Sequence, residues 1–257
     1  MAGSLGDSAM DEQEIRRLIG SVDTWHQTFE IEPGIRTPGN YDAEALLDRI
    51  ALPQDLKGMR ILDLGSNDGF FAATCVRRGA EVVAFDYRSK EASGFSVTEK
   101  VMGLSIPYIH DTIWNIERHE LGTFDIILFL GVLYHLPDPF RAIELLSRCC
   151  AGELYLETAY TRRGTVPLMR YFPDRSLNDD VSNFWLPNVS CVVGMLEDCG
   201  FQVERIDPDP NSPYGRWRRA VDLLSSERAG FSRLVVVARI VRSGGASHKV
   251  AYDILPP

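Results

Sequence analysis

The chain has 257 residues, of which 45% are hydrophobic, and its formal net charge is −9. That length accommodates one large hydrophobic core, as in a single α/β domain. No apolar run approaches the roughly 18–20 residues of a membrane-spanning helix, and the polar, acidic start is not expected to be a secretory signal. The excess of acidic residues does not favour a broad phosphate-binding surface.

The spacing of the cysteines argues against metal sites and disulfides. None of them shows the Cys-x-x-Cys spacing that marks zinc sites and redox motifs. Scattered thiols in apolar segments are typical of proteins that stay in a reducing compartment. We therefore expect no metal, no disulfide framework and a cytoplasmic location. The five residues are Cys75, Cys149, Cys150, Cys191 and Cys199.

The first part of the chain is predicted to be a helical cap. Residues 1–20 resemble a short helix with a single apolar stripe. Pro-Gly breaks between residues 22 and 40 exclude a long helix there. The segment "YDAEALLDRI", residues 41–50, is predicted to be an amphipathic helix that stops before Pro53.

From residue 60 onward, strand and helix patterns alternate. The strand interiors are nearly continuous apolar runs, as expected for parallel strands that helices cover on both faces. Five β-α units and a closing pair of strands predict an α/β fold with a Rossmann-like, doubly wound seven-stranded sheet. Helices are predicted at 69–78, 138–150 and 189–199, and strands at 60–65, 81–86, 106–110, 124–130, 153–159, 201–206 and 232–240.

The first of these strands runs into a glycine-containing turn, "ILDLGSNDGFF" at residues 61–71. A phosphate-binding loop would need Lys-Ser/Thr after Gly69, and the sequence has none there. A dinucleotide site would need Gly-x-Gly-x-x-Gly, whereas here Asp68 lies in the turn, where its charge would repel a pyrophosphate. A turn that tolerates negative charge favours a cationic ligand. The sulfonium and ammonium groups of S-adenosylmethionine fit that description.

Acidic residues also lie at the ends of three successive strands. Asp63 can take the ammonium group of such a ligand, and Asp86 can accept both ribose hydroxyls. Asp111, with Thr112, can meet the adenine amino group. Each residue alone has a simpler interpretation, because glycines shape tight turns and an acid after a strand often caps a helix. Together, at one edge of a parallel sheet, they predict a nucleotide pocket.

The chain resembles a class I S-adenosylmethionine-dependent methyltransferase, within the bacterial group that contains the tRNA wobble-uridine carboxymethyltransferase. "FDIILFLGVLYHLPDP" carries that group's Gly-Val-Leu-Tyr-His signature at residues 131–135, and "FWLPNVSCVVGMLEDCGF" is similar to its lid element and following helix. "GELYLET" and "SRLVVVARI" resemble its fifth and last strands, and "TWHQTFEIEPG" and "NYDAEALLDRI" its N-terminal approach to the core. The resemblance covers roughly residues 22–240.

The resemblance implies a division of the chain and a set of cofactor contacts. The expected parts are an N-terminal helical cap and active-site cover (1–55), a methyltransferase domain (56–242) with a lid insertion (161–187), and a C-terminal tail (243–257). Asn67 stands where the family has Gly, and Asn tolerates left-handed backbone angles. With the acids above, the residues predicted to bind S-adenosylmethionine are Asp63, Gly65, Ser66, Asn67, Gly69, Asp86, Tyr87, Asp111, Thr112, Leu130, Tyr134, Tyr41, Trp25 and Arg233.

Tyr134 and His135 are the predicted catalytic residues. The resemblance places Tyr134 close to the transferred group. An imidazole with a pKa near 6.5 suits the removal of a hydroxyl proton, so His135 is a candidate base. A structural histidine that bonds a main-chain carbonyl is the alternative. The other histidines, His26, His110, His119 and His248, lack shared spacing or paired acids and are expected to be structural or surface residues.

The predicted substrate-binding residues are Gln27, Arg170, Phe184 and Trp185. In the carboxymethyl-transferring relative, a Lys joins the signature Tyr and the last-strand Arg to hold the carboxylate of carboxy-S-adenosylmethionine. Gln27 occupies that Lys position here. A charge-assisted contact contributes roughly 1.5–3 kcal/mol, so ordinary S-adenosylmethionine is the expected cofactor.

Three functions remain open. The first is methyl transfer to an oxygen or nitrogen of a small-molecule acceptor, for instance a ring-bearing secondary metabolite, which the acidic charge supports. The second is modification of a tRNA uridine, supported by the Arg- and Trp-containing run 216–219 and the arginines of the predicted lid. The third is a nucleotide-binding regulatory module, against which Tyr134 and Arg233 argue. A homo-oligomer is also left open.

Overall fold

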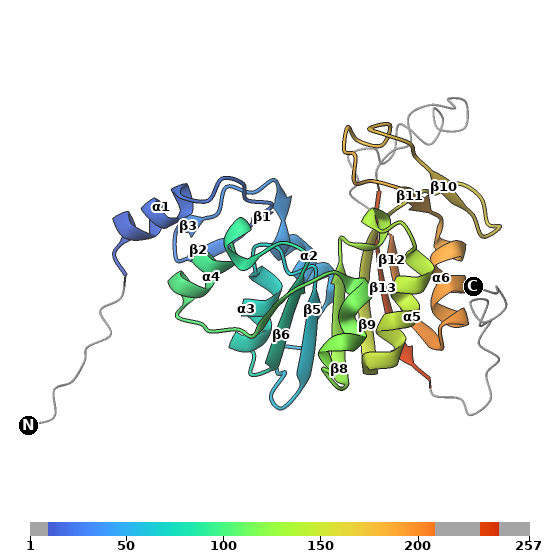
Figure 1. The fold of residues 1–257 in the computed structure, drawn as a ribbon, viewed down its shortest axis with the longest axis horizontal. Coiled ribbons are helices and arrows are strands. Elements are labelled where there is room, and N and C mark those ends of the chain that lie inside the picture. The colour runs from blue at the N-terminus through green and yellow to red at the C-terminus, as the bar shows by residue number, and fades with distance from the viewer. Residues whose placement is uncertain (1–9, 209–231, 242–257) are drawn as a thin grey trace, which may run out of the picture.

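The computed structural model describes residues 10–208 and 232–241. A seven-stranded sheet forms its centre, in the strand order β12-β13-β9-β8-β5-β6-β7 (Figure 1). The strands from β5 to β9 pair in parallel, and β13 is antiparallel to both β9 and β12. The predicted Rossmann-like, doubly wound α/β fold is confirmed.

The elements follow the predicted ranges closely. Strands β6, β8 and β13 have the predicted bounds, whereas β9 begins earlier, at Cys150, and β7 later, at Tyr108. The sheet consists of β5 (Arg60–Leu64), β6 (Glu81–Asp86), β7 (Tyr108–His110), β8 (Phe124–Leu130), β9 (Cys150–Tyr160), β12 (Phe201–Pro208) and β13 (Ser232–Ile240). The helices are α1 (Glu12–Gly20), α2 (Ala43–Ile50), α3 (Phe70–Arg77), α4 (Phe95–Met102), α5 (Pro139–Cys149) and α6 (Val189–Asp198).

Two hydrophobic cores lie on the two faces of the sheet. Successive side chains of a strand point to opposite faces. Ile61 therefore packs with α1 to α4 on one face, while its neighbour Leu62 packs with α5 and α6 on the other. Both faces are apolar and covered, which explains the nearly continuous apolar runs of these strands.

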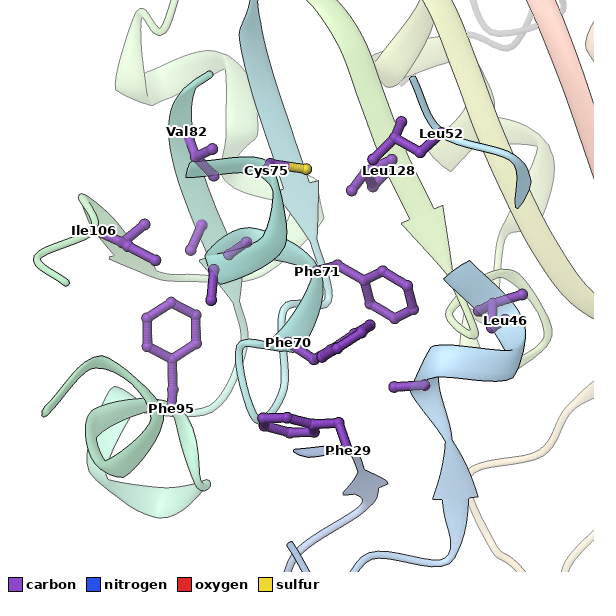
Figure 2. Close-up of a cluster of buried hydrophobic side chains, with 14 of the residues drawn as sticks. Phe29, Leu46, Leu52, Phe70, Phe71, Cys75, Val82, Phe95, Ile106 and Leu128 are labelled. Carbon is purple, nitrogen blue, oxygen red and sulfur yellow. The ribbon is translucent and has the colours of Figure 1, made fainter. Parts of the chain in front are cut away.

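The N-terminal part packs into the same core as β5 and α3. Besides α1 and α2 it contains four short strands, so it is less helical than the predicted cap: β1 (Gln27–Thr28), β2 (Glu30–Glu32), β3 (Ile35–Arg36) and β4 (Tyr41–Asp42). Phe29 lies against Phe70 at the start of α3, with 5.0 Å between the ring centroids (Figure 2). This aromatic contact joins the N-terminal part to the segment that follows the glycine turn.

Two arginines fix α2 beside β12 and β13. Arg205 donates to the carbonyl oxygens of Arg49 and Ile50, at 2.9 and 2.6 Å, at the end of α2. Such terminal carbonyls have no partner within the helix. Arg49 in turn donates to the carbonyl of Asp207 at 3.0 Å. The N-terminal part therefore contacts the rest of the molecule at α3 as well as at strand β12.

The predicted lid contains an antiparallel pair, β10 (Met169–Tyr171) and β11 (Trp185–Pro187). It lies at the upper right in Figure 1, and β11 contacts both β9 and the 3-10 turn η3 (Leu133–His135). Asn188 caps α6 and donates through its side-chain amide to the carbonyls of Arg163 and Val166, at 3.2 and 2.7 Å. These bonds tie the start of the predicted lid to the helix that follows it.

Some predictions fall on residues that the structure does not describe. They are residues 1–9 of the helix predicted at 1–20, the 216–219 run, His248 and the predicted tail at 243–257. Within 10–208 and 232–241, no helix is long and apolar enough to cross a bilayer.

Candidate cofactor and acceptor site

The turn after β5 has left-handed backbone angles at three positions. The φ angles of Gly65, Asn67 and Gly69 are 82°, 50° and 87°. Asn67 thus adopts the left-handed conformation expected of it. A Cβ atom at Gly65 would lie 2.4 Å from Cγ2 of Val132, in the loop after β8. Gly65 is therefore required for space as well as for its backbone angle.

Ser66 and Asp86 connect this turn to the end of β6. The Ser66 hydroxyl donates to the carbonyl of Asp63 at 2.6 Å and accepts from the Phe85 backbone N–H at 3.1 Å. Any contact of Ser66 with a cofactor would therefore use its main chain. Asp86 accepts backbone N–H groups from Asn67 and Arg88, both at 2.9 Å. A carboxylate has about four acceptor positions, so Asp86 keeps capacity for the ribose hydroxyls.

Asp63 carries a buried carboxylate oxygen without a partner. The residue is 2% exposed, and its Oδ2 has no hydrogen bond within the described part of the chain. Burial, followed by the charge of nearby Asp86, raises the pKa of Asp63 to about 7. Leaving such a group unpaired is unfavourable, and an ammonium group would satisfy it. The glycine turn, Asp63 and Asp86 therefore fit the cationic amino-acid end and the sugar of S-adenosylmethionine.

Asp68 has a different role from the one expected. It is fully buried, and its carboxylate accepts backbone N–H groups from His26 and Gln27, both at 2.7 Å, and from Gly94 at 2.9 Å. Three such donors stabilise the charge within the protein. The expectation that Asp68 would present its charge to a ligand is therefore corrected. Asp68 instead binds the N-terminal part and the start of α4 to the turn.

Asp111 lies just before the 3-10 helix η2 (Ile113–His119), whose N-cap residue is Thr112, and its carboxylate binds groups of that segment. Its carboxylate accepts from the side chain of Asn115 at 2.8 Å, from His119 at 2.8 Å and from the Thr112 N–H at 2.7 Å. These bonds lower the pKa of Asp111 to about 2. The expectation that His119 has no paired acid was wrong. A contact of Asp111 and Thr112 with adenine stays a prediction.

Three other residues predicted to bind the cofactor differ in how far they are exposed to solvent. Tyr87, after β6, is 72% exposed, and Leu130, at the end of β8, is half-buried. Trp25 is buried, and its indole N–H donates to the carbonyl of Ile19 at 3.0 Å, so the structure gives it a packing role within the N-terminal part.

Gln27 lies beside the glycine turn. Its side-chain oxygen accepts from the Phe70 N–H at 3.2 Å, in the first turn of α3, where the N-cap Gly69 has no side chain to do so. Gln27 was predicted to bind substrate together with residues of the lid, but its hydrogen bond places it next to the residues predicted to bind the cofactor. The correspondence of its neutral amide to the relative's Lys stays a prediction from the resemblance.

Tyr134, Arg233 and Tyr41 come together around a buried acid, Glu157. Arg233 donates through Nε and Nη2 to the two carboxylate oxygens of Glu157, the second bond being 2.6 Å, and through Nη1 to the Tyr134 hydroxyl at 2.9 Å. The guanidinium carbon lies 5.1 Å from the Tyr134 ring centroid and 5.4 Å from that of Tyr41, within cation–π range. The charge of Arg233 is therefore matched inside the protein.

Glu157 is not among the predicted site residues, although the sequence holds one signal for it. A charged residue within a buried strand needs a partner.

Burial raises the pKa of Tyr134, so that its phenol stays protonated at neutral pH. Tyr134 can therefore position a neighbouring group without carrying charge itself.

Among the described residues, His135 is hydrogen-bonded through Nδ1 alone. Its Nδ1 lies 3.0 Å from the Ser182 carbonyl oxygen and 2.9 Å from the Ser182 hydroxyl, so the bond to a main-chain carbonyl is present. Nε2 has no partner among the described residues. Burial lowers the pKa of His135, which keeps the imidazole neutral and able to accept a proton. The rings of Tyr134 and His135 are 4.0 Å apart, so this histidine adjoins the Arg233 cluster.

Phe184 and Trp185 hold the turn that carries the predicted catalytic residues. The Phe184 N–H donates to the Tyr134 carbonyl at 3.0 Å, and the Trp185 indole donates to the Leu136 carbonyl at 3.1 Å. Arg170 lies over the ring of Phe172 at 4.6 Å. Arg170 also lines a cavity of about 110 Å³ together with Thr161, Arg163, Leu168, Phe172 and Leu186. Three of the four predicted substrate residues thus lie on one hairpin.

Comparisons with known proteins agree with this geometry. Residues 36–206 match the methyltransferase domain family. The tRNA U34 carboxymethyltransferase of Desulfotalea psychrophila is 25% identical over 79% of this chain and 64% of its own length. The ubiquinone biosynthesis O-methyltransferase of Hahella chejuensis is 33% identical over 43% of this chain and 46% of its own length. The chain thus spans about half to two thirds of the length of these curated relatives.

Solved structures share the fold. The N-terminal domain of EvdMO1, crystallised with S-adenosylhomocysteine (SAH) and D-fucose, has a TM-score of 0.64 at 20% identity, over 92% of this chain and 100% of that one. The family match extends from the N-terminal part through β12 and includes the glycine turn, Asp86 and the 131–135 signature. This chain therefore belongs to the methyltransferase domain family, a family of S-adenosylmethionine-dependent enzymes, and has the class I fold.

Proposed function

We propose that this protein transfers the methyl group of S-adenosylmethionine to a hydroxyl oxygen of a small-molecule acceptor. The observation that carries the proposal is the state of His135. Its Nδ1 is held by Ser182, its Nε2 is unbonded among the described residues, and burial keeps it neutral. A neutral imidazole beside Tyr134 supplies a general base, which a hydroxyl needs more than an amine does.

The residues at the carboxyl ends of β5 and β6 would hold the cofactor. Asp63 would pair with its ammonium group, Asp86 with its ribose, and the main chain of the glycine turn would line it. When bound, S-adenosylmethionine supplies an electrophilic methyl group on a cationic sulfur. The protein itself would align the acceptor oxygen and give its proton a destination.

Gln27 and Glu157 support ordinary S-adenosylmethionine over its carboxylated form. Gln27 is neutral at the position where the carboxymethyl-transferring relative has Lys. Arg233 is the remaining cation, and Glu157 already pairs with it through two bonds. In the relative, the extra carboxylate of the cofactor would face two cations, a Lys and an Arg. Here it would face Arg233 alone, whose charge Glu157 already neutralises.

The test is a search for a labelled product. The protein is incubated with S-adenosylmethionine that carries a deuterated methyl group, together with a fractionated small-molecule extract. Sugars and other ring compounds with free hydroxyls are included, because the EvdMO1 domain was crystallised with D-fucose. We expect a product one deuterated methyl group heavier than its precursor, formed by the native protein and lost in His135→Ala. A parallel incubation contains total RNA in place of the extract, and label found only there would overturn the proposal.

A tRNA uridine is the second candidate acceptor. One observation favours it: the relative with the longest alignment reported above, covering 79% of this chain, is a tRNA U34 carboxymethyltransferase. Exposed arginines of the predicted lid, Arg162, Arg163 and Arg175, would then contact phosphates. Filter binding of bulk tRNA at low and moderate salt separates the two, because phosphate contacts make binding steeply salt-dependent.

A further inference from the structure

The loop before β11 forms a chain of hydrogen bonds that ends at His135. The Ser182 hydroxyl donates to Oδ1 of Asp180 at 2.7 Å, and the Ser182 backbone N–H donates to the same oxygen at 2.8 Å. The Ser182 hydroxyl and carbonyl oxygens then lie 2.9 and 3.0 Å from Nδ1 of His135. Three residues from two distant segments are therefore connected.

The direction of these bonds fixes the tautomer of His135. A carbonyl oxygen can only accept, and an ionised carboxylate can only accept. The single proton of the Ser182 hydroxyl is directed to Asp180, so this hydroxyl also acts as an acceptor toward the ring. Both oxygens beside Nδ1 thus require a proton on it. In the neutral ring the lone pair is then on Nε2.

The charge of Asp180 persists under working conditions. Its partial burial opposes ionisation, but the two hydrogen bonds from Ser182 outweigh that effect and lower the pKa of Asp180. The ionised form is the one that can only accept, so the bond directions above hold at neutral pH.

We propose that Asp180 and Ser182 are positioning residues that hold His135 in the tautomer able to take the acceptor's proton. The proposal rests on the proposed function, methyl transfer to a hydroxyl. In the step, the acceptor O–H bond would break, its proton would go to Nε2, and the electron pair left on oxygen would form the new bond to the methyl carbon. The bond from that carbon to sulfur would break, its electron pair would return to the sulfur, and SAH would leave. The imidazolium later releases its proton to water. Asp180, through Ser182, stabilises that cation.

Side chains from three segments influence the protonation of His135. Asp180, from the loop before β11, favours the imidazolium, whereas Arg233 of β13 and His26 of the N-terminal part oppose it. Burial opposes it as well and has the largest effect. Asp180 is therefore the acid that offsets these influences, and its removal should make His135 a weaker base.

The decisive measurement is the nuclear magnetic resonance of the histidine rings in the full chain, labelled with nitrogen-15, with and without SAH. His135→Gln identifies the relevant signals. We expect a proton on Nδ1 and a bare Nε2 in the native protein at neutral pH. Asp180→Asn should lower the pKa of His135 by about half a unit or more. A proton on Nε2 in the native protein would overturn the proposal.

The matched control is Asp179→Asn, one residue away. The Asp179 side chain is 87% exposed and faces Arg175, so solvent should screen it from His135. Its removal should leave the pKa of His135 unchanged. If Asp180→Asn and Asp179→Asn behave alike, Asp180 does not act on the ring and the proposal fails.

A second variant and a kinetic measurement distinguish positioning from folding. Ser182→Ala removes the hydroxyl but keeps the carbonyl bond, so the tautomer should persist while the effect of Asp180 on the ring pKa is lost. With the acceptor fraction from the labelling experiment, Asp180→Asn should lower kcat about tenfold, with KM unchanged. If no methyl transfer is found with any fraction, the proposed function fails, and the ring tautomer and pKa still decide this inference.

Discussion

Arg233 and Glu157 form a two-point ion pair between β13 and β9, and the Glu157 side chain is completely buried. The pair also sets the position of Tyr134, to which Arg233 donates. A buried pair of this kind contributes little net stability when intact, but the loss of one partner leaves an uncompensated charge. The pair is therefore a structural requirement of the site.

Glu157→Gln should lower the free energy of unfolding by about 3–5 kcal/mol, because it leaves the Arg233 charge unmatched. Urea denaturation measures this change. The control is Glu153→Gln in the same strand, because its partner Arg239 is 58% exposed and also pairs with Glu204. That change should have an effect of about 1 kcal/mol or less. Equal effects of the two substitutions would contradict the importance of burial.

The affinity for SAH should depend on pH, because Asp63 is expected to pair with the ammonium group of this ligand. Because the folded-state pKa of Asp63 is about 7, above its ordinary value of 3.8, the unliganded protein should lose stability between those values as pH rises. The ligand pairs with the ionised form. Its affinity should therefore increase about tenfold from roughly pH 6 to pH 8. Calorimetry in two buffers measures both affinity and proton release, and Asp63→Asn should abolish the dependence. A flat native profile would argue against this pairing.

Gly65→Ala should impair SAH binding and lower thermal stability. The new Cβ would lie 2.4 Å from Val132, and the backbone angle is left-handed. Gly34→Ala is the matched control, since its φ is also positive but a Cβ there meets nothing within 4 Å. Backbone strain alone should amount to about 1–2 kcal/mol. Thermal denaturation should show a larger loss for Gly65→Ala, part of which Val132→Ala restores. A loss no larger than that of Gly34→Ala would mean that the contact is unimportant.

Trp185→Ala should impair acceptor use more than cofactor binding. The indole donates to the Leu136 carbonyl, close to Tyr134 and His135 in the chain, and within the described residues no hydrogen bond joins it to the glycine turn. We expect kcat/KM for the acceptor to fall at least tenfold, the result of losing about 1.4 kcal/mol of transition-state stabilisation. The dissociation constant of SAH should change less than twofold. Trp185→Phe keeps the ring and loses the hydrogen bond, so it should be intermediate. Equal losses for acceptor and cofactor would contradict this placement.

The sheet and the glycine turn follow from local sequence. The apolar runs at 82–85 and 126–130 have no polar interruption, and acids or turns lie next to both of their ends. The short strands β1 to β4 could not be predicted in this way. Strands of two or three residues are too short to show a period, and their pairing depends on contacts with the core.

Side-chain partners depend on register and tertiary packing, which local patterns do not contain. Arg233 faces Ala159 in the β13–β9 pair, two residues from Glu157 on the same face of the sheet. That register could not be known before the strands were placed. The sequence predicts that Asp68 presents its charge to a ligand because it lies within the glycine turn, but its carboxylate accepts main-chain N–H groups of residues 26 and 27. His135 and Ser182 are 47 residues apart, and no periodicity links them.

The three bonds of Asp68 make the N-terminal part inseparable from the turn it covers. A shortened chain that begins at residue 56 would retain this acid and lose two of its donors along with the Phe29 contact. Water would then enter beneath the floor of the nucleotide pocket. Attempts to isolate the sheet as a minimal domain should therefore yield a protein whose methyl-donor pocket is misshapen, even if every strand pairs correctly.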